Sequence, residues 1–287
     1  MNLKDIFKIL IKYKLLGKKI PLCANIILSK NTQGLYKVPP SQNYDFDKII
    51  NTLKNDNIKW ADVEIDETTN LSDFYNFSEK LIKNHINPIL SFSPSSVIPD
   101  NLEIFSRFEL FIDNMDDESG FSNCITTMQK ISSYRKRFTI TTNLIKKNIP
   151  KLLQYVQLAG VFKSLIYFQP VFKELIEKER YESLIPGIEE YKKGIMALID
   201  IKKSWQSRFI RNSLSGLLHI YDWPDNFSNI QCASGKLFYY ILPDGNKYNC
   251  IFKPSSYNCS GCGICGNLEM NFFFNNKYLP LIHLKSL

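Results

Sequence analysis

The chain has 287 residues, of which 44% are hydrophobic, enough for one large α/β domain and a small appended one. Its net charge of +8 is spread along a lysine-rich chain, which argues against nucleic acid as a partner. No run approaches the ~20 apolar residues of a membrane-spanning helix, and the first residues lack the pattern of a signal peptide. We therefore expect a cytoplasmic protein.

Residues 1–20 predict a basic amphipathic helix. Leu3, Ile6 and Leu10 fall on one side of it, and Lys4 and Lys8 fall elsewhere. A helix of this kind either packs against one end of the main domain, which we favour, or makes a peripheral contact with a membrane surface.

From residue 21 onward, short apolar runs alternate with longer helix-like segments. The expected strands are residues 22–29, 61–65, 88–92, 108–112, 138–142 and 164–168, and the expected helices include 45–55, 71–84, 121–134 and 149–159. Repeated strand and helix units predict an α/β fold with a parallel sheet, either a barrel or a doubly wound sheet. Such folds place their chemistry at the carboxyl ends of the strands.

A β-hairpin is expected near the C-terminal end of the sequence. Residues 243–245 form a Pro-Asp-Gly turn between two strand-like runs, 237–242 and 247–251. Cys232 precedes the first run and Cys250 ends the second, so the hairpin brings these two thiols to the same end.

Five of the seven cysteines lie within this region. After Cys232 and Cys250 come Cys259, Cys262 and Cys265, which form two overlapping C-x-x-C units. A C-x-x-C turn directs two sulfurs at one centre, so hairpin and turn together supply four thiolates, with one cysteine to spare. Four thiolates suit either zinc, which the spacing slightly favours, or an iron-sulfur cluster, and unliganded thiols are a third interpretation.

The other chemical groups carry weaker signals. The acidic run 113–118 follows the fourth expected strand and is interpreted as a solvated loop, with cation binding as the alternative. Cys23 and Cys124 stand alone. We expect Cys23 to be buried as a small hydrophobic residue, and neither cysteine is a good substitute metal ligand.

The cysteine pattern resembles a known family. Cys232, twelve residues, Gly245, four residues and Cys250, followed by a cysteine-rich turn, is similar to the opening of the SPASM and twitch domains of radical S-adenosylmethionine (radical SAM) enzymes. The resemblance implies one 4Fe-4S cluster, rather than zinc, held by Cys232, Cys250 and two of the last three cysteines. It also implies a partial (β/α)6 TIM-like barrel before that domain.

The resemblance implies a division of the chain into four parts. These are an N-terminal helix at 1–20, a radical SAM-like barrel at 21–203, a bridge at 204–230 and a SPASM/twitch-like iron-sulfur domain at 231–287.

The barrel departs from the family at its main cofactor site. If Ser29 takes the place of the family's threonine, the cysteine positions of the C-x3-C-x-x-C loop fall on Thr32, Tyr36 and Pro39, which cannot hold a cluster. The family's Gly-Gly-Glu stretch corresponds to residues 65–67, which contain no glycine. We therefore do not expect S-adenosylmethionine to bind in the usual pose.

Three functional hypotheses follow. The first is a non-catalytic 4Fe-4S protein with a radical SAM-like fold, a pseudoenzyme that partners a radical SAM enzyme or a peptide substrate in a maturation system. The second is an active enzyme that uses the C-terminal cluster for electron transfer or Lewis-acid chemistry. The third is a zinc-ribbon-like binding module. No catalytic residue is assigned under any of them.

Overall fold

The computed structural model describes residues 21–32, 36–37, 44–95, 97–171, 176–204, 208–223 and 234–250. Its main feature is an eight-stranded sheet with the strand order β10-β9-β1-β4-β5-β6-β7-β8. Every neighbouring pair from β9 to β8 is parallel, whereas β10 is antiparallel to β9. In chain order the strands are β1 (Cys23–Ile27), β4 (Trp60–Glu64), β5 (Asn87–Phe92), β6 (Arg107–Phe111), β7 (Arg137–Asn143), β8 (Leu165–Gln169), β9 (Phe238–Ile241) and β10 (Lys247–Tyr248).

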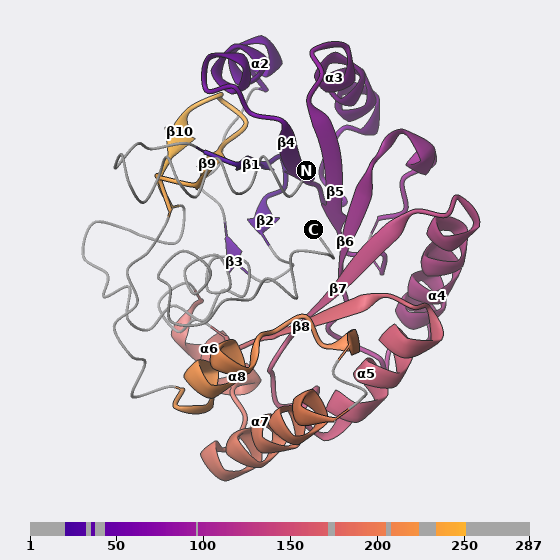
Figure 1. Cartoon of the computed structure of the whole chain (residues 1–287), viewed down its shortest axis with the longest axis vertical. Coiled ribbons are helices and arrows are strands. Elements are labelled where there is room, and N and C mark those ends of the chain that lie inside the picture. Colours follow the sequence, from indigo (N-terminus) through magenta and orange to yellow (C-terminus); the bar gives the residue numbers. More distant parts are fainter. Residues whose placement is uncertain are drawn as a thin grey trace.

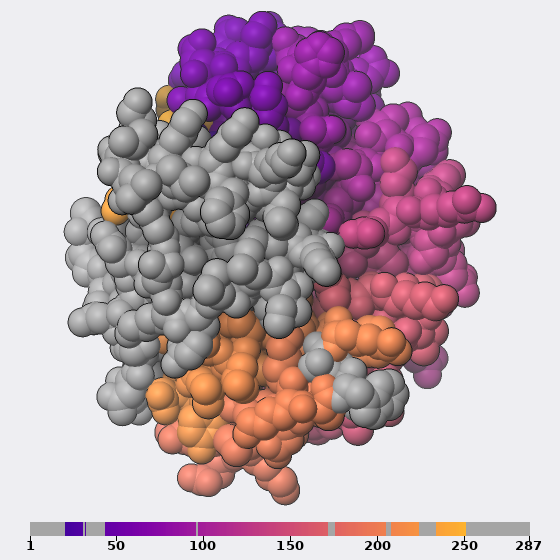
Figure 2. All heavy atoms as spheres, in the orientation of Figure 1, coloured from indigo at the N-terminus to yellow at the C-terminus, as the bar shows by residue number. Residues whose placement is uncertain are grey.

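The connecting elements lie mainly on one side of this sheet. They are α2 (Phe46–Asn55), α3 (Leu71–Lys83), η1 (Leu102–Ile104), α4 (Glu118–Ser133), η2 (Ile149–Lys151), α5 (Leu152–Val161), α6 (Lys178–Leu184), α7 (Ile188–Lys203) and α8 (Leu214–Tyr221). Helices α2, α3, α4 and α5 surround the curved sheet, while the short pair β2 (Asn31–Thr32) and β3 (Tyr36–Lys37) lies toward its inner side (Figure 1). In the space-filling view, α2 and α3 form the upper rim of the molecule and α7 and α8 the lower rim (Figure 2).

The expected strands and helices are confirmed, with shifts at the starts of two helices. Helix α5 begins at Leu152, after the short helix η2, where the expected helix began at residue 149. All six strands lie within about two residues of the predicted ranges. Helix α4 begins at Glu118, three residues earlier than expected, because Asp117 caps it: the Asp117 carboxylate accepts a hydrogen bond from the Gly120 amide. The α/β fold class with a parallel, helix-covered sheet is thus confirmed, in the arrangement of a partial barrel.

The two faces of the sheet differ in character. Register partners on neighbouring strands share a face, so Ile26, Val63, Leu90 and Phe108 form one row, and all four side chains are fully buried. Phe108 meets the ring of Phe105, which in turn stacks on a phenylalanine of α3, so this row faces the helices. The opposite row, which includes Glu64, Ser91 and Glu109, therefore lines the inner face.

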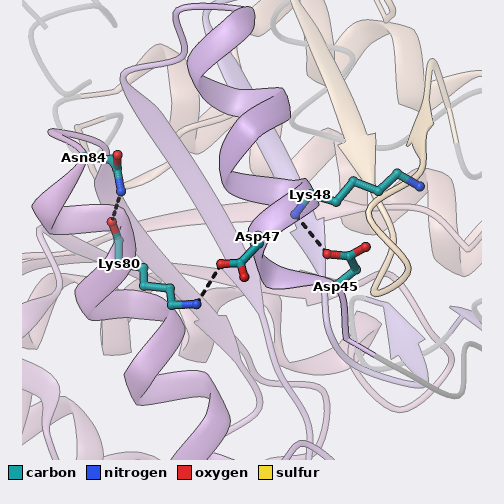
Figure 3. A network of polar contacts seen from close by, with 5 residues as sticks. All are labelled: Asp45, Asp47, Lys48, Lys80 and Asn84. Carbon is teal, nitrogen blue, oxygen red and sulfur yellow. Dashed lines mark hydrogen bonds and ion pairs between the residues drawn. The ribbon is translucent and has the colours of Figure 1, made fainter.

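Helix α2 is joined to its neighbour α3 by polar contacts at its first turn. Asp45 caps α2 by accepting the amide of Lys48, and the ammonium of Lys80 on α3 lies 2.8 Å from the carboxylate of Asp47 (Figure 3). Asn84 ends α3 by donating its side-chain amide to the carbonyl of Lys80. The cap therefore fixes the start of α2, and the ion pair of Asp47 joins this first turn to α3.

Residues 208–223, from the expected bridge, pack against the barrel. Ile210 forms a parallel bridge with Ile166 of β8, and Tyr191 of α7 donates its hydroxyl to the carbonyl of Ile220 (2.7 Å). Asn212 is fully buried and exchanges hydrogen bonds of 2.8 and 2.9 Å with the backbone of Phe168. This segment therefore completes the β8 edge of the sheet.

Across the described part of the chain, the structure has no helix that is long and apolar enough to cross a membrane. The helix predicted at 1–20 lies outside the described residues.

Candidate functional site

The loop after β1 is tied to the carboxyl end of β4 by a buried hydrogen bond. Thr32 Oγ1 donates to Glu64 Oε2 at 2.7 Å, and the two side chains belong to residues only 2% and 6% exposed. Glu64 is the last residue of β4, and its register partner on β1 is Ile27. The position expected for the first cluster cysteine is thus a threonine bonded to a buried carboxylate.

A second carboxylate holds the same loop. The backbone amide of Lys30 donates to Asp66 Oδ2 at 2.8 Å, and Asp66 Oδ1 accepts from both the amide and the hydroxyl of Thr68. The backbone amide of Ile65 donates a hydrogen bond to the carbonyl of Ser91 (3.0 Å). The pairing of β4 with β5 therefore continues to residue 65, where the family's glycines would lie. The stretch that in the family approaches S-adenosylmethionine is engaged in protein hydrogen bonds here.

This edge of the barrel does not fit a 4Fe-4S cluster. Tyr36 pairs with Thr32 in the small β2–β3 sheet, and Pro39 lies outside the described residues. The side chains of Thr32, Glu64 and Asp66 present hydroxyl and carboxylate oxygens, which are hard ligands, whereas such a cluster is held by cysteine thiolates. In the described ranges, no group of three or more His, Cys, Asp or Glu side chains is placed to hold a metal ion.

A second pair of carboxyl groups, Asp62 and Glu109, lies on the inner face. Ser91 donates to Asp62 Oδ1 at 2.5 Å, and Thr141 donates to Glu109 Oε1 at 2.7 Å. Burial, and next the charge of Glu109, raise the pKa of Asp62 to about 7, although the Ser91 hydroxyl acts in the opposite direction. An acid of this pKa can exchange a proton near neutral pH.

Asp113, the first residue of the acidic run, is half-buried and hydrogen-bonded to β7, whereas the later acids Asp116, Asp117 and Glu118 are exposed, as expected of a solvated loop. Its carboxylate accepts from the amide of Asn143 (2.7 Å) and from the Asn143 side chain (2.6 Å). Burial raises the pKa of Asp113, while the hydrogen bonds from Asn143 and Thr142 lower it. Gln169 of β8 extends this network to the next strand by donating to Asn143 (3.0 Å).

The inner-face groups escaped the sequence analysis because no motif unites them. Asp62, Ser91, Glu109 and Thr141 lie on four different strands, β4 to β7. The sequence feature that could have revealed them is a polar residue at every second position of a strand that is otherwise expected to be buried.

The hairpin that carries Cys250 is confirmed and docks on the barrel. Strand β9 pairs in parallel with β1, and the hairpin turn contacts α2, where Lys48 Nζ donates to Asp244 O (3.1 Å) and Asn246 Oδ1 (2.7 Å). Gly245 at this turn has a φ of +73°, a conformation that favours glycine. The cysteine therefore follows a segment that is fixed to the main sheet.

Of the five predicted metal ligands, Cys250 lies within the residues that the structure describes. It is half-buried and packs against the hydrophobic core. Ser234, which follows Cys232 by two residues, donates its hydroxyl to the carbonyl of Asn249, next to Cys250. Cys232, Cys259, Cys262 and Cys265 lie outside the described residues.

The two isolated cysteines are poor metal ligands. Cys124 is buried in α4, and burial together with the charge of Asp117 raises the pKa of its thiol to about 12. Cys23 is half-buried at the start of β1, where burial and then Asp62 raise its thiol pKa to about 12. Because the thiolate is the metal-binding form, both are disfavoured as ligands at neutral pH.

Known structures share this fold. SuiB of Streptococcus suis aligns with a TM-score of 0.56 and 12% identity over 98% of this chain and 72% of SuiB. The enzyme anSMEcpe with bound AdoMet aligns with a TM-score of 0.60 and 16% identity over 91% of this chain and 83% of that one. The same enzyme with bound AdoMet and Cp18Cys peptide gives 0.59. Neither a family model nor a curated protein matches the chain.

These neighbours are radical SAM enzymes, so the chain has a radical SAM-like fold. At 12 to 16% identity the likeness concerns the fold alone.

Proposed function

We propose that this chain is a 4Fe-4S protein with a radical SAM-like fold whose barrel performs no radical chemistry, and that it acts as a partner of a radical SAM enzyme or of its peptide substrate. The observation that carries the proposal is the buried hydrogen bond from Thr32 to Glu64 at the place of the cofactor-cluster loop. Three cysteines are needed there to leave one iron open for S-adenosylmethionine, and Thr32 and Tyr36 supply none of them.

The C-terminal cysteines fit a cluster by the chemistry of their donors. Cys232, Cys250 and two of Cys259, Cys262 and Cys265 would supply four thiolates, the set that such clusters require. The contact between Ser234 and Asn249 supports a shared site for Cys232 and Cys250, since each contact residue is a near neighbour of one of them. Bound there, the cluster would carry an electron or stabilise the segment.

The inner face of the barrel remains able to bind a polar ligand. Asp62 and Glu109 are half-buried and offer carboxyl groups that can accept from the amides of a peptide, whereas the buried Ser91 and Thr141 hold these carboxyl groups in place. The neighbour anSMEcpe has been solved with a bound peptide, which supports a peptide as the ligand. The chain's residues would then bind and orient the peptide for a partner enzyme, without reacting with it.

Anaerobic purification followed by iron, sulfide and zinc analysis tests the proposal. We expect about four iron and four sulfide per chain, together with no 5′-deoxyadenosine above background when a reductant and S-adenosylmethionine are added. Cys250→Ser should lower the iron content, whereas Cys124→Ser, which changes a buried cysteine of α4, should not. Cleavage of S-adenosylmethionine, or one zinc with no iron, would contradict the proposal.

A second candidate, an active enzyme that uses the C-terminal cluster for electron transfer or Lewis-acid chemistry, is favoured by one observation. Asp62 has a pKa near 7 beside Glu109, and perturbed carboxyl pairs gather at catalytic sites. An iron of the cluster that gains a ligand on addition of a candidate peptide would shift its electron paramagnetic resonance spectrum and support this function. An unchanged spectrum with a peptide that binds would count against this function and would exclude the Lewis-acid role.

A further inference from the structure

Three arginines gather at the amino end of the barrel's inner face. The chain has only six arginines among its 36 basic residues, and half of them, Arg107, Arg137 and Arg211, meet here. Arg107 and Arg137 are the first residues of β6 and β7 and are register partners, so their side chains leave the same face of the sheet. Glu109, two residues after Arg107, shares that face.

The third arginine comes from a distant part of the chain and is held in a defined orientation. The Arg211 amide donates to the carbonyl of Ile166 (2.8 Å), which places the residue beside β8. Its Nη1 donates to Thr139 Oγ1 (3.0 Å), and its guanidinium lies 4.9 Å from the centre of the Tyr167 ring. Stacking and hydrogen bonding together fix the plane of the guanidinium.

The three positive charges act on one another. Burial, then Arg211, then Arg137 lower the pKa of Arg107 to about 10, with Tyr167 and Glu109 acting in the opposite direction. The Glu109 carboxylate also accepts a hydrogen bond from Thr141. Arg107 and Arg211 are half-buried, so solvent screens their repulsion only in part.

A cluster of this composition suits an oxyanion. The guanidinium presents paired N–H donors that match the two oxygens of a carboxylate or phosphate, and lysine does not reproduce that geometry. In a chain where lysine outnumbers arginine, three arginines at one point are chemically distinctive. An anion bound between them would offset the repulsion among the three guanidinium groups, which adds to the effect of burial on Arg107.

We propose that Arg107, Arg137 and Arg211 form an oxyanion-binding site at the amino end of the inner face, which takes a carboxylate or phosphate group. Arg107 and Arg211 contact the anion from the half-buried side, and the exposed Arg137 closes the site from solvent. Thr32 and Glu64 lie at the opposite, carboxyl end of the strands, so the site goes beyond the proposed function and does not depend on any cluster.

Binding of inorganic phosphate and of citrate to the full-length protein, by calorimetry and thermal unfolding at constant ionic strength, tests the site. We expect saturable binding of at least one of these anions, and a rise in melting temperature that sodium chloride does not reproduce. Phosphate binding alone would assign the site to phosphate groups, and citrate binding alone would assign it to carboxylates. Absence of saturable binding by both would overturn the proposal.

Charge-conserving variants distinguish a specific anion-binding site from nonspecific electrostatic attraction. Arg107→Lys and Arg211→Lys should each weaken binding at least tenfold, because the paired donors are lost while the charge stays. Arg180→Lys, on the exposed surface of α6, should bind as the parent does. If Arg107→Lys does not fold, Arg137→Lys at the exposed position is used instead, and unchanged affinity in these variants would refute the site. Iron content should be the same in all of them, so failure here leaves the proposed function standing.

Discussion

Asp62 is a carboxyl group whose surroundings move its pKa into the neutral range. It lies on the inner face next to Glu109 and accepts a hydrogen bond from Ser91. Its pKa is raised to about 7, so the folded protein holds a proton that the unfolded chain loses near pH 4. The contribution of Asp62 to the free energy of unfolding is therefore most favourable below about pH 4, and it is lost as the pH rises to about 7.

Replacement of Asp62 by asparagine should change this pH dependence. The new amide side chain would stay neutral and could still accept from Ser91, so the D62N variant should be more stable than the parent above pH 7, by about 2 kcal/mol. The rise of the Asp62 pKa from about 4 to about 7 corresponds to ~4 kcal/mol. We expect about half of this free energy, because the two interacting carboxyl groups share the effect. Below about pH 4 the two proteins should unfold at the same urea concentration.

The matched control for Asp62 is Asp200→Asn on the exposed side of α7. It should leave the pH dependence of the urea midpoint unchanged. A D62N variant that loses stability at pH 8 would show that the ionised carboxylate is required by the fold.

At the scale of elements, the β9–β10 hairpin joins two parts of the chain that lie far apart in sequence. Its first strand extends the sheet beside β1, and its turn rests on α2 through Lys48. Lys247 adds an ion pair of 2.6 Å with Asp56, just after α2. The hairpin is thus held both by backbone pairing and by side-chain contacts, which positions the chain that leads to Cys250.

Gly245→Ala should loosen this docking. The residue has a φ of +73°, and a Cβ atom there would lie 2.8 Å from the Lys48 side chain. We expect a loss of about 1–2 kcal/mol in the free energy of unfolding, from backbone strain and displacement of Lys48. Gly187→Ala, at the N-cap of α7, is the control: a Cβ there would meet its nearest atom at 3.7 Å, so the variant should lose only the cap preference and less stability than Gly245→Ala by urea titration.

At the scale of the whole molecule, both edges of the parallel sheet depend on residues that follow position 203. Strand β9 covers β1 at one edge. At the other edge Ile210 and the buried Asn212 bind the backbone of β8. The barrel and the C-terminal part of the chain are therefore linked in their stability.

A fragment of residues 1–203 should not form a stable monomer. It would expose the edge of β1 and the polar backbone of β8 that Asn212 satisfies, and exposed parallel strands associate readily. Size-exclusion chromatography and circular dichroism of the fragment against the full chain would check this. A monomeric fragment with cooperative unfolding would contradict it.

Sequence patterns predicted the elements well and their partners poorly. Strand positions followed from apolar runs, and helices from their periodicity, because both signals are local. The early start of α4 was missed since Asp117 acts as a cap through one side-chain contact. The partner of β9 was not predictable, because nothing local in residues 237–251 identifies β1, more than 200 residues away, as its neighbour.

The sequence by itself determined the α/β class, the hairpin turn and the lack of cysteine at Thr32, Tyr36 and Pro39, since these depend on residue type and local spacing. The tertiary structure alone decided that Thr32 binds Glu64 and that Arg211 joins Arg107. These groups are 32 and 104 residues apart, and their meeting depends on strand order and on which face each side chain leaves.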